Sequence, residues 1–290
     1  MELIQSILQM REWSQKTRDQ KKTIGFVPTM GALHEGHLSL VRLAHQHADT
    51  VVVSIFVNPL QFAPHEDLDR YPKTLEKDLE HLKKESVDIV FVPKASEMYK
   101  SGAQTVVEVT ELSKPLCGKS RPGHFRGVAT VVLKLFQIVH PHVAIFGNKD
   151  FQQRLIIERL VQDLELDIKI ISGPIVREKD GLAMSSRNQY LSSDERLRSR
   201  VLNQALDKAK PMFQGGERNS ARIIMKVSEM IDKESPTHVD YIKICDAQTL
   251  EDVWDIHQKT VLAVAVYFGQ GHQMTRLIDN VVLDPHHGKI

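Results

Sequence analysis

The sequence predicts an α/β protein in which a doubly wound parallel sheet is followed by a second, smaller α+β domain. Short β-branched runs alternate with longer amphipathic stretches through about the first 175 residues, which is typical of strand–helix–strand units. Several of these runs are apolar at nearly every position, as expected for strands covered by helices on both faces. After Val176 the order changes to helices followed by strands. We therefore expect domains at residues 1–176 and 177–290.

The elements of the first domain follow from its apolar pattern. Strands are expected at 23–28, 50–57, 88–92, 105–109, 142–146 and 167–171. Leu75, Leu79 and Leu82 recur at helical spacing, as do apolar residues over 151–164, and a helical pattern starts near Leu38. The helix-like segment 124–140 ends before Pro141, because proline cannot continue a helix.

The second domain begins with a helix-start signal. Ser192 and Glu195 have the spacing of a capping box, in which each side chain bonds the backbone of the other. Two helices are expected near 193–210 and 217–233, separated by Gly215-Gly216, and three strands at 239–245, 260–268 and 275–283.

The amino-acid composition excludes several classes of protein. Of 290 residues, 41% are hydrophobic and 26% charged, which excludes a disordered chain, a collagen-like chain and a coiled-coil rod. Lys plus Arg (38) nearly balances Asp plus Glu (37), so a dedicated nucleic-acid binder is not expected. Cys117 and Cys245 form no CxxC pair and are expected to be reduced thiols.

The N-terminal segment and the length of the apolar runs indicate where in the cell the protein is expected. The first residues contain no basic segment followed by an apolar one, so no signal peptide is expected. The longest apolar run, 51–57, is far shorter than the roughly 20 residues that span a bilayer. We therefore expect a cytoplasmic protein without a membrane partner.

The loop after the first long strand has the features of a phosphate-binding turn. It reads PTMGALHEGH over residues 28–37. Gly31 permits a tight turn, and Gly36 lies where a helix N-terminus offers free N–H groups to an anion. His34 and His37 are spaced i, i+3, which disfavours an HExxH zinc site and places both rings on one face of the helix. A nucleotide site is the favoured interpretation.

Two further loops could complete such a site. The first, GNKDFQQ (147–153), follows the strand 142–146. Lys149 can neutralise phosphate charge, and Asp150 either accepts hydrogen bonds from ribose hydroxyls or merely caps the helix. The second, MSSRN (184–188), offers two hydroxyls and the permanently charged Arg187 at the seam between the domains. CGKS (117–120) is not a P-loop, because the first glycine of that motif is replaced by Ser113.

Together these strings resemble one family. The H-x-G-H turn with a later M-S-x loop is similar to class I aminoacyl-tRNA synthetases and related nucleotidyltransferases. The fuller strings resemble the pantoate–β-alanine ligase family over residues 20–195: PTMGALHEGH (28–37), FVNPLQF (56–62), EDLDRYP (66–72), RPGHFRGV (121–128), GNKDFQQ (147–153) and MSSRN (184–188). Asn148 departs from the pattern, because many relatives carry a longer polar residue there.

The resemblance implies a Rossmann-like first domain, a second domain that closes over it, and a homodimer. It also implies ATP with Mg²⁺, pantoate and β-alanine as substrates, a pantoyl-adenylate intermediate, and pantothenate, AMP and pyrophosphate as products. His37, as proton donor, with His34, Lys149 and Arg187 would be catalytic. Gln61 and Gln153 would bind pantoate, with Gln61 also near β-alanine. The residues implied to bind ATP are Met30, Gly31, Ala32, Leu33, His34, Glu35, Gly36, His37, Gly147, Asn148, Lys149, Asp150, Val176, Met184, Ser185, Ser186 and Arg187.

Some alternatives stay open at this level. The nearest is a nucleotidyltransferase that moves a nucleotide onto a phosphorylated acceptor; others are an RNA-binding module and a nucleotide sensor. The charged segment Ala63–Tyr71 is either a mobile lid or an ordinary loop. Arg121, His124 and Arg126 either line the phosphate site or cap the following helix.

Overall fold

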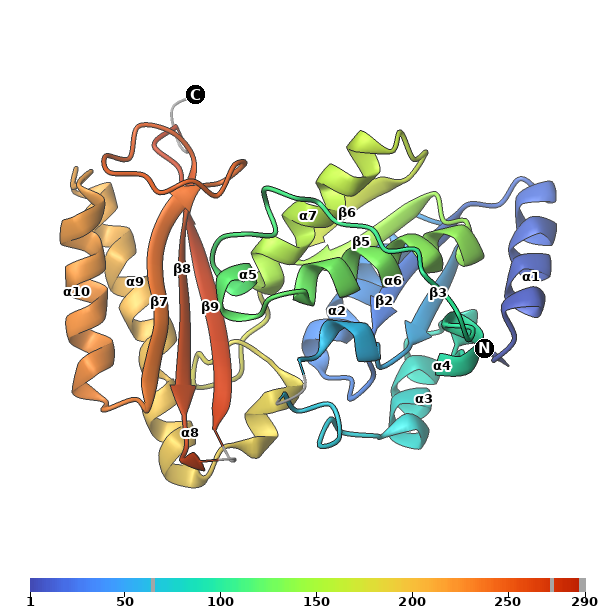
Figure 1. Ribbon diagram of the computed structural model, residues 1–290, viewed down its shortest axis with the longest axis horizontal. Helices are drawn as coiled ribbons and strands as arrows, with labels where there is room; N and C mark the ends of the chain where they lie inside the picture. Colours follow the sequence, from blue (N-terminus) through green and yellow to red (C-terminus); the bar gives the residue numbers. More distant parts are fainter. Residues whose placement is uncertain (64–65, 272–273, 287–290) are drawn as a thin grey trace. The chain divides into compact units, whose positions relative to one another are not determined.

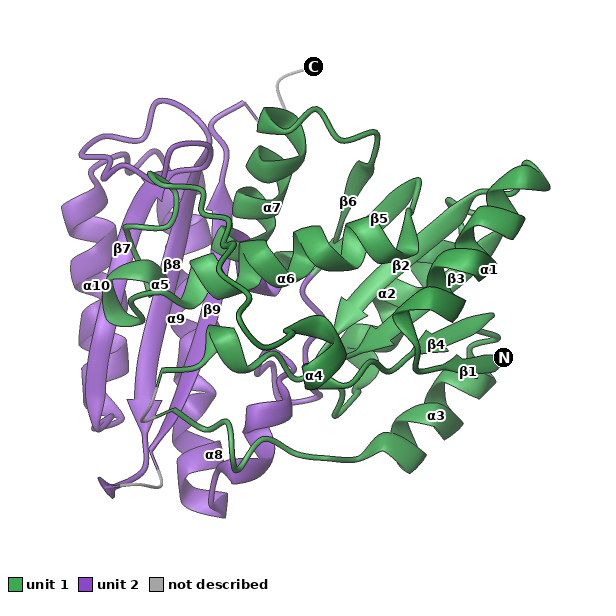
Figure 2. Ribbon diagram, turned by 45° about the vertical axis from the view of Figure 1, so that its right-hand side comes forward, with its two compact units in different colours: residues 1–148, 152–174 green, residues 149–151, 175–290 purple. Residues whose placement is uncertain are grey.

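The structure is a computed structural model that describes residues 1–63, 66–271 and 274–286. Its contacts divide the chain into two units, shown in green and purple in Figure 2. The first unit comprises Met1–Asn148 and Gln152–Pro174, and the second comprises Lys149–Phe151 and Ile175–Ile290. The short segment Lys149–Phe151 thus belongs to the second unit, although its chain neighbours on both sides belong to the first.

The first unit contains a six-stranded, fully parallel sheet in the order β1-β4-β3-β2-β5-β6. This confirms the doubly wound α/β prediction. Figure 1 labels β2, β3, β5 and β6, and Figure 2 also labels β1 and β4. From β2 the chain moves outward to β3 and β4, and it later continues on the other side through β5 and β6, so the winding reverses between β2 and β5. Ligands of such sheets bind at this switch point, beyond the carboxyl ends of the strands. The strands are β1 (Glu2–Ile4), β2 (Ile24–Thr29), β3 (Thr50–Ile55), β4 (Ile89–Phe91), β5 (Val143–Gly147) and β6 (Lys169–Gly173).

Helices cover both faces of this sheet. Phe26 and Val52 point toward α1 (Ile7–Asp19), α6 (His124–Val139) and α7 (Phe151–Asp163). Val27 and Val53 point the other way, toward α2 (Glu35–His45) and α3 (Leu75–Lys84). Alternate residues of each strand are therefore buried against different helices, which explains the nearly continuous apolar runs of the sequence.

The predicted strand at 105–109 is wrong. The segment pairs with no strand in the described ranges, most of it is exposed, and Val107 N–H donates to the Thr130 hydroxyl of α6 at 2.9 Å. β-branched residues favour an extended chain, but a strand also requires a neighbouring strand to bond. Strand β1 and helix α1 were not predicted, and β1 is too short to show a periodicity.

The second unit places helices α8 (Ser193–Ser199), α9 (Val201–Gln214) and α10 (Ser220–Lys233) before a three-stranded antiparallel sheet. The sheet contains β7 (His238–Asp246), β8 (Thr260–Phe268) and β9 (Thr275–Leu283) in that order, which confirms the α+β prediction. The capping box is present, with Ser192 N–H donating to Glu195 Oε2 at 2.8 Å. The single helix expected at 193–210 is divided at Arg200 into α8 and α9. None of the helices in the described ranges combines the length and apolar character needed to cross a bilayer.

Candidate functional site

The loop after β2 leaves the sheet at the switch point in a conformation that needs external support. Gly31 and Ala32 have φ values of +82° and +51°, and the second is unfavourable for a residue with a Cβ. Asp78 of α3 supplies the support: its carboxylate accepts hydrogen bonds from Ala32 N–H at 2.9 Å and Leu33 N–H at 2.8 Å. Asp78 is only 1% exposed. A Cβ on Gly31 would lie 3.1 Å from the same carboxylate, so the turn also requires glycine.

His34 and His37 lie side by side at the start of α2. His34 is the residue that precedes the first helical turn, and the two ring centroids are 4.1 Å apart. His34 N–H donates to His37 Nδ1 at 3.4 Å. Because Nδ1 accepts in this contact, it favours the neutral His37 tautomer that carries its proton on Nε2. The two rings therefore lie next to each other, although His34 has an extended backbone and precedes the helix.

Glu35 is oriented differently from these histidines. Its exposed carboxylate pairs with Arg42 of the same helix, and Arg42 also pairs with Glu85 at 2.5 Å. Hydrogen bonds that Arg42 donates to the carboxylates of Glu85 and Glu35 raise the pKa of its guanidinium. A contribution of Glu35 to ATP binding would therefore come from its backbone at the helix N-terminus.

The Gln61 side chain is buried among other polar groups. Asn58, which is 1% exposed, donates from Nδ2 to Gln61 Oε1 and to the carbonyl oxygen of Gly127, both at 3.1 Å. Burial raises the pKa of Tyr99 to about 12, and its hydroxyl donates to Asn58 Oδ1 at 2.8 Å. Gln61 Nε2 contacts Met30 Sδ at 2.9 Å. A thioether sulfur is a weak acceptor, so an oxygen of a bound ligand can replace it.

The backbone of Gln61 is fixed by two side chains at and just before the start of α6. Its carbonyl oxygen contacts His124 Nδ1 at 2.8 Å and accepts from Arg121 Nη2 at 3.3 Å. Arg121 is in turn bound through two nitrogens by Glu66, at 2.7 and 2.6 Å. Burial works against the charged form of Glu66, but the hydrogen bond and charge of Arg121 outweigh it and hold the pKa of that carboxyl below its usual value. Glu66 of the segment 63–71, which the sequence left open as either a lid or an ordinary loop, is thus bound to Arg121, while residues 64 and 65 lie outside the described residues.

The loop after β5 begins in the first unit and continues in the second. Gly147 ends the strand, and the turn Asn148–Asp150 carries Lys149, whose Nζ is 3.9 Å from an Asp150 carboxylate oxygen. The Lys149 carbonyl oxygen accepts from Asn280 Nδ2 at 3.0 Å, and both residues belong to the second unit.

The two adjacent glutamines of GNKDFQQ differ in their surroundings. Gln152 is buried and uses its whole amide within the protein: Nε2 donates to the carbonyls of Leu112 and Pro115 at 2.9 and 2.7 Å, and Oε1 accepts from Cys117 N–H at 3.0 Å. Gln153, in the first turn of α7, is half-buried. Gln152 therefore fixes the loop before α5 (Cys117–Ser120), and Gln153 is the one of the pair suited to bind a ligand.

The third predicted loop lies within the second unit. Met184 N–H donates to the Val176 carbonyl at 3.0 Å, so these two predicted ATP-binding residues are neighbours. Ser185 precedes the short helix η3 (Ser186–Tyr190), and its hydroxyl accepts from Arg187 N–H at 3.3 Å.

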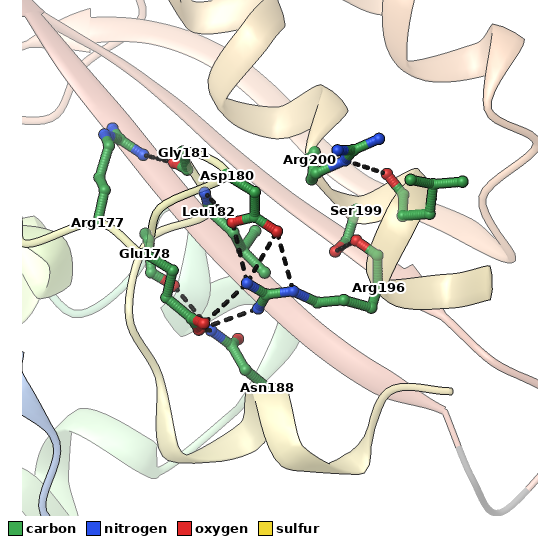
Figure 3. A network of polar contacts seen from close by, with 11 residues as sticks. Arg177, Glu178, Asp180, Gly181, Leu182, Asn188, Arg196, Ser199 and Arg200 are labelled. Atoms are coloured by element: carbon green, nitrogen blue, oxygen red, sulfur yellow. Dashed lines mark hydrogen bonds and ion pairs between the residues drawn. The ribbon is translucent and has the colours of Figure 1, made fainter. Parts of the chain in front are cut away.

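A network of ion pairs supports this loop (Figure 3). Arg196 of α8 donates to both oxygens of Glu178, at 2.9 and 2.8 Å, and to Asp180 at 2.9 Å. Asn188 Nδ2 donates to Glu178 at 2.7 Å and to the Ala183 carbonyl at 3.1 Å. The side chain of Asn188 therefore fixes the end of the MSSRN string. Among the described residues, no three His, Cys, Asp or Glu side chains gather as a metal site.

Comparison with known proteins shows the family of the chain. The family model described as pantoate-beta-alanine ligase matches residues 2–282. The chain belongs to the pantoate–β-alanine ligase family. It is 53% identical to the pantothenate synthetase of Thermotoga neapolitana, over 98% of this chain and 100% of that protein.

Solved structures of pantoate–β-alanine ligases share the whole fold. The crystal structure of the Thermus thermophilus pantothenate synthetase superimposes with a TM-score of 0.92 at 40% identity, over 98% of this chain and 100% of that one. The pantoate-beta-alanine ligase of Francisella tularensis, complexed with beta-gamma ATP and beta-alanine, gives a TM-score of 0.81 at 35% identity, over 97% of both chains.

Several residues of this pantoate–β-alanine ligase family member were not found from its sequence. Asp78, Asn58 and Tyr99 contact loops of the first unit, and Asn280 and Arg196 do so in the second. Asp78 lies in a leucine-spaced helix among other charged residues, so nothing local distinguishes it from a solvent-facing carboxylate. Asn58 and Arg121 stand inside family strings, and the strings were the available signal for them.

Proposed function

We propose that this protein joins pantoate to β-alanine at the expense of ATP, through a pantoyl-adenylate intermediate, and releases AMP and pyrophosphate. The observation that carries the proposal is the loop at the switch point, where Asp78 holds the backbone and His34 and His37 lie at the N-terminus of α2. This is a preorganised anion site of the kind that nucleotide phosphates occupy. Membership of the ligase family supports the choice of pantoate and β-alanine.

The first step forms the adenylate. A pantoate carboxylate oxygen attacks the α-phosphorus of ATP, which enters as its Mg²⁺ complex, and the bond to pyrophosphate breaks. Negative charge grows on the phosphate oxygens, so positioned cations and donors provide most of the catalysis. We assign this role to His34, His37, Lys149 and Arg187, with Ser185 and Ser186 as additional donors to the phosphates.

Neutral groups suit the pantoate site. Gln61 and Gln153 can bind hydroxyls and a carboxylate without neutralising the carboxylate that must attack, whereas an arginine would lower its nucleophilicity. Asn58 occupies Gln61 Oε1, which orients Nε2 toward Met30 Sδ and leaves that donor to be taken over by a substrate oxygen.

The second step forms the amide. The uncharged amine of β-alanine attacks the activated carbonyl carbon, the nitrogen loses one proton, the bond to the phosphate oxygen breaks, and AMP leaves. The acyl group remains on AMP until this step, without an enzyme thioester. Burial and the nearby Asp252 raise the pKa of the Cys245 thiol to about 12, which makes it a poor nucleophile.

The deciding experiment is ATP–pyrophosphate exchange with labelled pyrophosphate and Mg²⁺ in the absence of β-alanine. Exchange that requires pantoate would establish a reversible acyl adenylate and attack at the α-phosphorus. Exchange that requires a phosphorylated acceptor instead would favour the nucleotidyltransferase alternative. We also propose a homodimer, which size-exclusion chromatography with light scattering would test.

A further inference from the structure

Two neighbouring residues of β9 contact both segments of the second unit that carry predicted ATP-binding residues. Asn280 Nδ2 donates to the carbonyl oxygen of Lys149 at 3.0 Å. Asp279 accepts from Arg177 Nη1 at 2.6 Å and Nη2 at 3.0 Å. Asp279 and Asn280 are 2% and 5% exposed, so both are buried polar groups whose contacts lie within the protein.

Arg177 links Asp279 to the hairpin that precedes the MSSRN string. The same Nη1 that binds Asp279 also donates to the Gly181 carbonyl at 3.1 Å. The backbone of Arg177 forms a bridge with Ala183 on the returning strand. The Val176–Met184 hydrogen bond lies one residue outside that bridge. The ion pair therefore fixes the base of the hairpin at the point where its two predicted ATP-binding residues meet.

Strand β9 is suited to hold both segments at a constant separation. It pairs with β8 at every position from Thr275 to Leu283 without a register shift. The backbone N–H of Asn280 also donates to Asp279 Oδ1 at 2.8 Å. This bond ties the orientation of the Asp279 carboxylate to the backbone of Asn280. Because adjacent residues of a strand point to opposite faces, one short stretch of β9 reaches two different segments.

We propose that Asp279 and Asn280 are positioning residues, which hold the Lys149 turn and the Val176–Met184 hairpin in one rigid frame for the phosphates of ATP. This inference rests on the proposed function. Lys149 has a long, flexible side chain, and a fixed backbone limits the positions that its ammonium group can reach. Charge placed in advance costs no reorganisation when the transition state forms, so the frame raises the rate as well as the affinity.

The test compares Asn280→Ala and Asp279→Asn with Asp246→Asn as a matched control. Asp246 is a buried carboxylate of the same unit (8% exposed) that accepts hydrogen bonds from Gln248, Thr249 and Gln258. We expect Asn280→Ala to lower the rate constant of pantoate-dependent exchange about tenfold, and Asp279→Asn to raise the KM for ATP about tenfold. The KM for pantoate should change less than twofold in both, and Asp246→Asn should leave both parameters within twofold.

A double-variant measurement separates positioning from general stability. If Asn280 acts through Lys149, then adding Asn280→Ala to Lys149→Ala should cause almost no further loss. A full tenfold further loss would overturn the inference. So would equal losses in all three single variants with parallel falls in melting temperature, because these would indicate destabilisation of the whole unit.

Failure of the proposed function can be distinguished from failure of the inference about β9. If the unmodified protein showed no exchange with pantoate, that function would fail. The inference about β9 would then be read from ATP affinity by isothermal titration. A loss of affinity in Asp279→Asn but not in Asp246→Asn would support it, and equal affinities in both would contradict it.

Discussion

Replacement of Asp78 by asparagine tests whether the loop after β2 is held for ATP by one buried carboxylate. An asparagine has the same shape but offers one acceptor oxygen, so one of the two N–H groups of Ala32 and Leu33 would face an NH₂ group instead of an oxygen. Loss of a charge-assisted hydrogen bond at this buried site costs about 1.5–3 kcal/mol. The left-handed conformation of Ala32 is equally unfavourable in both proteins, so it adds nothing to the difference between them, but it favours other loop conformations once the bond is lost.

The lost bond therefore places the change at about 1.5–3 kcal/mol, and every 1.4 kcal/mol corresponds to a factor of ten. If the cost falls on the ATP-competent loop, the dissociation constant of ATP should rise on the order of 10- to 100-fold, while pantoate binding changes little. Isothermal titration with each ligand measures the two constants. Thr74→Val is the matched control, because it removes only the longer, 3.2 Å hydroxyl contacts of Thr74 to the same carboxylate and leaves both of its backbone N–H bonds in place. ATP binding within twofold of the parent in a folded Asp78→Asn protein would refute the reasoning.

The remaining predictions concern the catalytic groups and the support of the pantoate site. His37→Ala and Lys149→Ala should each slow adenylate formation on the order of 100-fold, and near-normal single-turnover rates in both would contradict their assignment. Gln61→Ala should raise the pantoate concentration required for half-maximal rate with ATP binding little changed, as titration with each ligand would show. The ion pair of Glu66 has a lowered carboxyl pKa, so its stabilisation is fully present above about pH 4.5 and is lost as the pH falls through the lower folded value. Urea unfolding at several pH values should show the difference between the parent and Glu66→Gln shrinking below pH 4.5, and a constant difference would contradict the pairing.

Much of the fold could be predicted because its signals are local. The strands 260–268 and 275–283 were predicted with the bounds that the structure shows, since apolar runs between glycines and polar loops mark both ends. The capping box at Ser192 is likewise an interaction between residues three apart. The segment 105–109 has the same composition as a strand, but whether a strand forms depends on a partner elsewhere in the chain, and among the described residues this segment pairs with none.

The residues of the candidate site also fall into those with a local sequence signal and those without one. The residues proposed to bind substrates stand in short strings, such as HEGH and MSSRN, so the sequence alone could nominate them together with the family. The residues that hold those strings are distant from them: Asp78 is 45 and 46 positions from the N–H groups it binds, and Asn280 is 131 positions from Lys149. Tertiary structure decided these partners, because a buried polar group is satisfied by whichever donor or acceptor the fold brings within reach, and separation along the chain does not restrict that choice.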